Sequence, residues 1–183
     1  LVLIMGATSS ALGDPADAAS QARSWRQAHE QKIIEDFVAL LSIPNVASDS
    51  PNILRNAQHI SSLLEARQFQ VRLLEAAGSP PAIFAERNSP GADKTLMIYV
   101  HYDGQPVNPD DWAAEPWNPV RRDASVESGG QIGPMRPPYQ PEWRIIARTA
   151  GDDKAPVIAL TAALDALDEA GIGLSVNLKL FFE

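Results

Sequence analysis

A nearly all-apolar run, from Leu96 to Val100, is followed at once by His101 and two positions later by Asp103. Such a run is typical of a strand that is covered on both faces of a sheet. Residues two apart on a strand project to the same face, so we expect the side chains of His101 and Asp103 to lie together at the carboxyl end of this strand. Ligands usually bind at that edge of an α/β sheet. The feature therefore predicts an α/β protein with a functional site where the strand ends.

Helical and strand-like patterns alternate along the rest of the chain. Apolar residues at steps of three and four predict helices over residues 24–42, from residue 50 to about 64, and over about 156–170. Strand patterns cover residues 69–74, 82–86, 95–100, 143–147 and 176–182. This alternation predicts a three-layer α/β domain with a largely parallel central sheet. Prolines and glycines concentrate in residues 104–142, which we interpret as a long, mostly irregular inserted loop.

Composition narrows the classes of function. Fifteen basic and twenty-three acidic residues give a net charge of −8, which argues against a nucleic-acid partner because such a partner requires a basic patch. The chain has no cysteine, so disulfides, thiolate metal sites and cysteine nucleophiles are excluded. Of the histidines, we expect His29 to be solvated and His59 to be a surface or packing residue. His101 is therefore the histidine we assign to chemistry.

The first eighteen residues are expected to be the remnant of a signal peptide. Residues 1–12 are largely apolar but too short to span a bilayer, and Ala16-Asp17-Ala18 has the form of a signal-peptidase site. The alternative is a frayed tail or a buried apolar segment. We therefore expect a secreted or periplasmic protein without a membrane span, whose residues 19–183 form part of a catalytic domain. Because the chain lacks an initiating Met and stops at Glu183 after a strand-like run, we expect it to be part of a longer protein.

A second candidate stretch begins with Asp152-Asp153, where a loop meets the helix predicted from about Pro156. One carboxylate can cap that helix, which requires no function. Two adjacent carboxylates exceed what a cap needs, and a carboxylate can bridge two divalent cations. A neutral imidazole such as that of His101 can bind a metal through one nitrogen while a nearby carboxylate orients it. Taken singly, each stretch also fits a purely structural role.

Together the two stretches resemble the M20 metallopeptidases, which include carnosine dipeptidases, glutamate carboxypeptidases and aminoacylases. Residues 101–107 are similar to the family element H-x-D-x-Q-P, and residues 152–156 to D-D-K-G-P. Residues 41–44 resemble its S-I-P signature, and residues 181–183 the start of F-x-E-G-x-E-E. The resemblance covers about Trp25 to Glu183 and holds in the same order along the chain.

The chain departs from the family pattern at three places. It has Ala147-Arg148-Thr149 where the family usually has Gly-Arg-Gly, and Ala155 where the family has glycine. The interval from His101 to Asp152 is 152 − 101 = 51 residues, longer than we expect for the family. The excess lies in residues 125–141. None of these changes removes a ligand, and the insertion bears on substrate preference more than on the metal site.

The resemblance implies a role for each matching residue. His101 would bind one of two divalent ions, expected to be Zn²⁺, Asp152 would bridge both ions, and Asp103 would orient His101 and contribute to catalysis. The resemblance assigns no substrate-binding residue. The general base and the remaining ligands would follow Glu183, which would be the first glutamate of its motif. We therefore expect residues 1–183 alone to bind metal weakly and to be inactive.

The function implied by the resemblance is an M20-type hydrolase, similar to a dipeptidase, that cleaves a peptide amide bond with water activated by two metal ions. Its substrate would be a small peptide or an acyl amino acid, and a homodimer is compatible with the family. Two alternatives stay open. One is an N-acyl amino-acid deacylase on the same fold, and the other is a non-catalytic secreted binding protein that has kept the fold without its metals.

Overall fold

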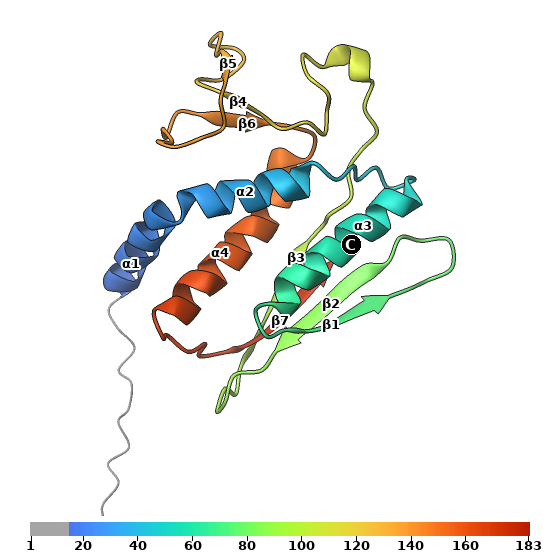
Figure 1. The fold of residues 1–183 in the computed structure, drawn as a ribbon. Coiled ribbons are helices and arrows are strands. Elements are labelled where there is room, and N and C mark those ends of the chain that lie inside the picture. The colour runs from blue at the N-terminus through green and yellow to red at the C-terminus, as the bar shows by residue number, and fades with distance from the viewer. Residues whose placement is uncertain (1–14) are drawn as a thin grey trace, which may run out of the picture.

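The computed structural model describes residues 15–183 (Figure 1). The predicted signal remnant lies largely outside the described residues; the backbone from residue 15 already belongs to helix α1 (Pro15–Ala28). Helix α2 (Glu30–Leu41) follows directly, so the single helix predicted over 24–42 is two helices. They meet at His29, whose ring stacks on Trp25 with centroids 4.1 Å apart. Among the described residues, none of the helices combines the length and apolarity that crossing a membrane requires.

Helices α3 (Ser50–Glu65) and α4 (Ala155–Glu169) lie close to their predicted positions. The cap of α3 is Asp49, whose side chain accepts a hydrogen bond from the Asn52 backbone N–H at 3.3 Å. Pro51 lies in the first turn of α3, where its missing N–H costs nothing. The predicted apolar stripe of α3 is completely buried and consists of Ile53, Ala57, Ile60 and Leu64.

The main sheet has four strands in the order β1-β2-β7-β3. These are β1 (Gln70–Leu74), β2 (Ala82–Arg87), β3 (Thr95–Val100) and β7 (Asn177–Phe182). Strand β2 pairs antiparallel with both β1 and β7, and only β3 and β7 are parallel. The α/β class is confirmed, but the sheet is mixed rather than largely parallel. The short β1–β2 connection allows only an antiparallel pair, whereas the crossover through α4 makes β3 and β7 parallel.

Helices cover one face of the main sheet (Figure 1). The core between them contains buried side chains from both layers, including Leu40, Ile60, Leu64, Ile83, Val157, Leu180 and Phe182. The predicted third layer is not formed by the described residues. Strand β3 lies at an edge of the sheet instead of its centre, and its side chains Met97 and Tyr99 are 58% and 56% exposed. The apolar run therefore predicted a strand correctly, but its burial on both faces is not observed within residues 15–183.

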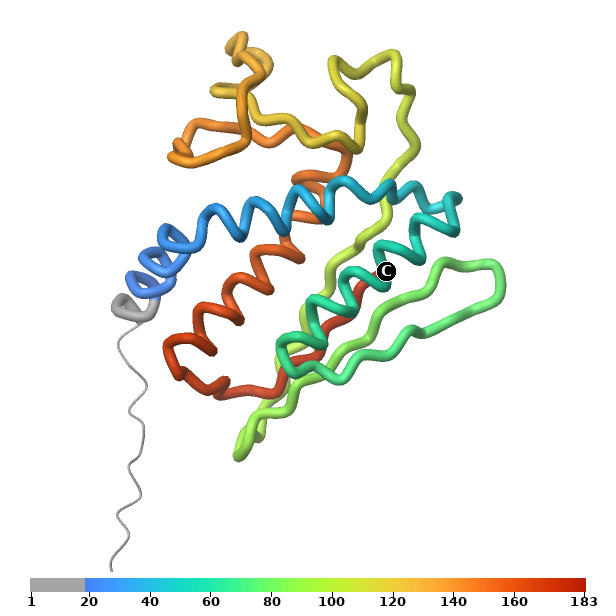
Figure 2. The backbone as a smooth tube through the Cα atoms, viewed as in Figure 1, coloured from blue at the N-terminus to red at the C-terminus, as the bar shows by residue number. Residues whose placement is uncertain are grey.

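The predicted inserted loop, residues 104–142, contains more regular structure than we expected. After the short helix η1 (Pro109–Asp111) the chain forms β4 (Val120–Arg122) and β5 (Ile132–Gly133), which join β6 (Arg144–Ile146) in a separate antiparallel sheet of order β5-β4-β6. Figure 2 shows this excursion apart from the main sheet. The guanidinium of Arg121 lies 4.0 Å from the centroid of the Trp143 ring and is buried there. This contact gives the small sheet a packed interior that the proline spacing does not reveal.

Candidate metal centre

The backbone pairing of β3 with β7 continues past the last residue of β3. The Tyr102 N–H donates to the Glu183 carbonyl at 2.6 Å, and the Glu183 N–H donates to the Val100 carbonyl at 3.3 Å. Tyr102 points into the core, is fully buried and donates its hydroxyl to the Pro81 carbonyl. Because side chains alternate along extended backbone, His101 and Asp103 project away from that core on the same side. The predicted pairing of these two residues at the strand end is therefore present.

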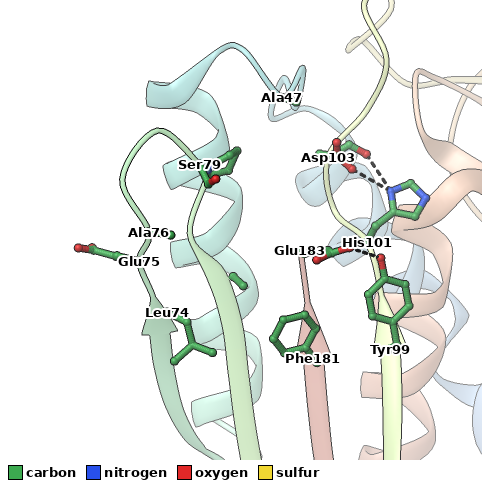
Figure 3. A pocket seen from close by; sticks show the side chains of 12 residues that line it. Ala47, Leu74, Glu75, Ala76, Ser79, Tyr99, His101, Asp103, Phe181 and Glu183 are labelled. Atoms are coloured by element: carbon green, nitrogen blue, oxygen red, sulfur yellow. Dashed lines mark hydrogen bonds and ion pairs between the residues drawn. The ribbon is translucent and has the colours of Figure 1, made fainter.

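The imidazole of His101 lies between two carboxylates from distant parts of the chain. Its Nδ1 is 3.0 Å from Asp103 Oδ1, a contact visible in Figure 3. Its Nε2 is 2.9 Å from Asp152 Oδ1. The His101 side chain is 32% exposed, whereas that of Asp152 is 91% exposed. The structure thus brings all three predicted site residues together.

The two carboxylates also change the acidity of the imidazole. Partial burial lowers the pKa of His101, but the hydrogen bonds with Asp152 and Asp103 outweigh it and raise the pKa above its ordinary value. Metal ligation requires a neutral imidazole nitrogen, so protonation of His101 competes with any ion that binds at Nε2.

Asp152 lies on an irregular wide turn, η2 (Ala150–Lys154), which leads directly into α4. The peptide bond between Asp152 and Asp153 is cis. No side chain caps the start of α4, so neither carboxylate serves the structural role that the sequence left open. Freed from capping, the Asp152 carboxylate extends into solvent beside His101 and is available to a ligand.

The turn that carries Asp152 is anchored by Lys154, a residue whose contribution sequence reasoning missed. Its side chain is fully buried, and its Nζ donates to the carbonyls of Leu40 at 2.8 Å and Ile43 at 2.7 Å. Burial lowers the pKa of this amine to about 7. The only signal in the sequence is the family-like position of Lys154 after the paired aspartates, which does not disclose its partners.

Glu183 does not face the imidazole. Its carboxylate accepts a hydrogen bond from the Tyr99 hydroxyl at 2.6 Å (Figure 3). An open cleft of about 600 Å³ runs along this part of the sheet, and its lining includes Tyr99, His101, Asp103, Phe181 and Glu183. Neither His29 nor His59 lines this cleft.

The donor atoms present fit one edge of a zinc site. Bonds of ~2.0–2.1 Å to a tetrahedral zinc ion separate two ligand atoms by about 3.3 Å. His101 Nε2 and Asp152 Oδ1 are 2.9 Å apart, so a shift of a few tenths of an ångström, on the order allowed at an exposed carboxylate, would let both bind one ion. Within residues 15–183 no group of three His, Cys, Asp or Glu side chains is arranged to hold an ion together. The described residues therefore offer a pair of ligands, not a complete coordination shell.

Comparisons with known proteins find Cys-Gly metallodipeptidases among the curated relatives. No family model matches the chain. The Cys-Gly metallodipeptidase dug1 of Schizosaccharomyces pombe is 28% identical over 165 residues, which are 81% of this chain and 31% of that protein. The chain thus spans about a third of the length of the curated relatives it matches.

Solved structures agree with the curated relatives. The fold matches dipeptidase Dug1p from Saccharomyces cerevisiae with a TM-score of 0.70 at 23% identity, over 90% of this chain and 34% of that one. It also matches an M20-family metallo-carboxypeptidase from Sulfolobus solfataricus with a TM-score of 0.61 at 29% identity, over 82% of this chain and 30% of that one. The chain is therefore similar in sequence to part of the Cys-Gly metallodipeptidases, and its fold matches part of an M20-family metallo-carboxypeptidase.

Proposed function

We propose that this chain supplies one side of the metal centre of an M20-type dipeptidase, a hydrolase that cleaves a small peptide at its amide bond. The observation that carries the proposal is the imidazole of His101 held between Asp103 at 3.0 Å and Asp152 at 2.9 Å. The relatives support the same class, since the curated ones are named Cys-Gly metallodipeptidases.

Each of the three residues has a distinct part in the proposal. Asp103 accepts the Nδ1–H of His101, which fixes the tautomer and directs the Nε2 lone pair outward. His101 Nε2 and Asp152 would hold the metal, with Asp152 as the ligand shared by two ions. When bound, two divalent ions, zinc by donor type, supply Lewis acidity to the scissile carbonyl and acidify water. Within residues 15–183 we assign no general base, because Glu183 is engaged by Tyr99 instead of facing His101.

The reaction is tested in the complete gene product that contains these residues. Cys-Gly, other dipeptides and N-acetyl amino acids are assayed in parallel with zinc present, before and after a chelator. We expect dipeptide turnover that the chelator removes and His101→Ala abolishes. Turnover of the N-acetyl compounds alone would favour a deacylase. Absence of both zinc binding and turnover would favour a binding protein that has kept the fold without its metals. Chelator-resistant turnover that His101→Ala leaves unchanged would contradict the metal centre.

Two finer expectations are proposals of the same kind. Export rests on the apolar first residues and on the A-x-A site at residues 16–18. N-terminal sequencing of secreted material should find a start near Ala19, and a cytoplasmic product that retains Leu1 would contradict export. A homodimer is tested by light scattering of the purified gene product at several concentrations.

A further inference from the structure

The two segments that carry the candidate ligands pack tightly against each other at Gly104 and Thr149. Gly104 lies three residues after His101, and Thr149 lies three residues before Asp152. A Cβ added at Gly104 would lie 2.5 Å from Thr149 Cγ2, closer than real Cβ atoms approach other atoms. The methyl group of Thr149 therefore occupies the space that any side chain at position 104 would need.

The buried side-chain amide of Asn45 packs against this contact. Asn45 is fully buried, and its side-chain Nδ2 donates to the Tyr102 backbone carbonyl at 2.7 Å. The backbone carbonyl of Asn45 accepts a hydrogen bond from the Gly104 N–H, also at 2.7 Å. Its Oδ1 accepts from Trp117 Nε1 at 3.3 Å and lies 3.4 Å from Thr149 Oγ1. One residue from the segment after α2 thus contacts both ligand-bearing segments.

The backbone conformation of Thr149 indicates that Gly104 and Asn45 hold this residue in position. Its φ is +61°, in the left-handed region that β-branched residues rarely adopt. Glycine takes this conformation without strain, whereas threonine does not. The chain therefore combines a β-branched residue at position 149 with the smallest residue, glycine, at position 104.

We propose that Gly104 and Thr149, backed by Asn45, are positioning residues that set the separation of His101 Nε2 and Asp152 Oδ1. Neither residue is a hydrogen-bond partner of the His101 ring or of the Asp152 carboxylate. They fix how closely the segment after β3 approaches the turn η2, and the 2.9 Å separation of the two donor atoms follows from that approach. The inference rests on the metal centre proposed above and adds the pair of residues that determines its metal affinity.

The test inserts one methyl group at the contact in the complete gene product. Gly104→Ala should push Thr149 away and weaken zinc binding by about tenfold, the lower end of losses from residues around a metal's ligands. The matched control is Gly151→Ala in the turn itself, where an added Cβ meets nothing within 4 Å. We expect this control to bind zinc as the parent does. Zinc affinity is measured by competition with a chromophoric chelator, and thermal unfolding is followed for every variant.

A second substitution should repair the first. Thr149→Gly removes the methyl group that Gly104→Ala displaces and also relieves the positive φ, so the double variant should recover zinc affinity to within about threefold of the parent, as expected for directly coupled positions. A general loss of stability would not be repaired in this way. If Gly104→Ala alone fails to fold, recovery of folding and zinc binding in the double variant supports the proposal equally.

His101→Ala separates this inference from the metal centre itself. If His101→Ala leaves zinc affinity unchanged, the proposed centre fails. If His101→Ala weakens zinc binding while Gly104→Ala behaves like Gly151→Ala, the positioning role alone is overturned. A double variant that is unfolded, or that stays as weak in zinc as Gly104→Ala, overturns it as well.

Discussion

His101 and Asp152 meet at one point, but the chain holds them there by different means. His101 follows a strand, and the backbone hydrogen bonds of Glu183 with Val100 and Tyr102 fix its place in the sheet. Asp152 lies on an irregular turn, and that turn is held by the buried Lys154 amine. A position held by backbone pairing tolerates many side-chain changes, whereas a position held by one buried cation depends on that side chain. The two ligands should therefore respond alike to their own removal and differently to changes nearby.

The largest effect is expected when either ligand is removed. His101→Ala and Asp152→Ala should each lower activity of the complete gene product by more than about a hundredfold, beyond the losses typical of residues that only support a ligand. Both should also lower zinc content to a similar extent, because the loss of a donor atom does not depend on how the donor was held. Bound zinc is measured by mass spectrometry after equilibration. A large difference in zinc content between the two variants would break this part of the comparison.

Removal of the buried cation should be the next largest effect. Lys154→Met leaves the carbonyls of Leu40 and Ile43 buried without their donor, which should reduce the free energy of unfolding by about 3 kcal/mol and weaken zinc binding. Tyr102→Phe is the matched change on the His101 side, because it removes one hydrogen bond to Pro81. It should cost about 1 kcal/mol and leave zinc affinity nearly unchanged. Denaturant unfolding and zinc titration of both variants check this, and equal zinc affinities would contradict the distinction.

Removal of Asp103 should have an intermediate effect. Asp103→Ala leaves both donor atoms in place but removes the carboxylate from His101 Nδ1, so that only the backbone carbonyl of residue 103, at 3.2 Å, still orients the ring. Activity should fall about 10- to 100-fold while more zinc is retained than in His101→Ala. The measurement is activity at matched zinc occupancy. If Asp103→Ala loses as much zinc as His101→Ala, Asp103 is a ligand rather than an orienting residue.

The smallest effect is the pH dependence of stability that comes from Lys154, the residue that anchors the turn carrying Asp152. The pKa of Lys154 is lowered to about 7 in the folded chain, while an exposed lysine has 10.5. Between these values the unfolded chain binds more protons, so the free energy of unfolding should rise with pH; below about pH 7 both states are protonated and the dependence vanishes. From pH 6 to 8 the gain should be about 1 kcal/mol relative to Lys154→Met, which lacks the amine. If stability changes with pH equally in the parent and in Lys154→Met, the contribution of Lys154 is excluded.

The periodicity of the sequence was enough to locate most elements. Strand β3 was predicted with its observed bounds from a continuous apolar run, and α3 with its whole buried stripe from its helical period, because both patterns are local. The shared side of His101 and Asp103 follows from the alternation of extended backbone for the same reason. The motif resemblance supplied Asp152, which no local pattern distinguishes from a helix cap.

Only the tertiary structure determined which strands pair and which distant residues become neighbours. The order β1-β2-β7-β3 places the most apolar strand at an edge and pairs β2 with β7, whose residues are far apart in the chain. Pairing between distant strands depends on the whole set of competing partners, so no single segment encodes it. The same holds for Asn45 and Lys154: their side chains bind backbone carbonyls, which every residue possesses, and only folding determines which carbonyls come within reach.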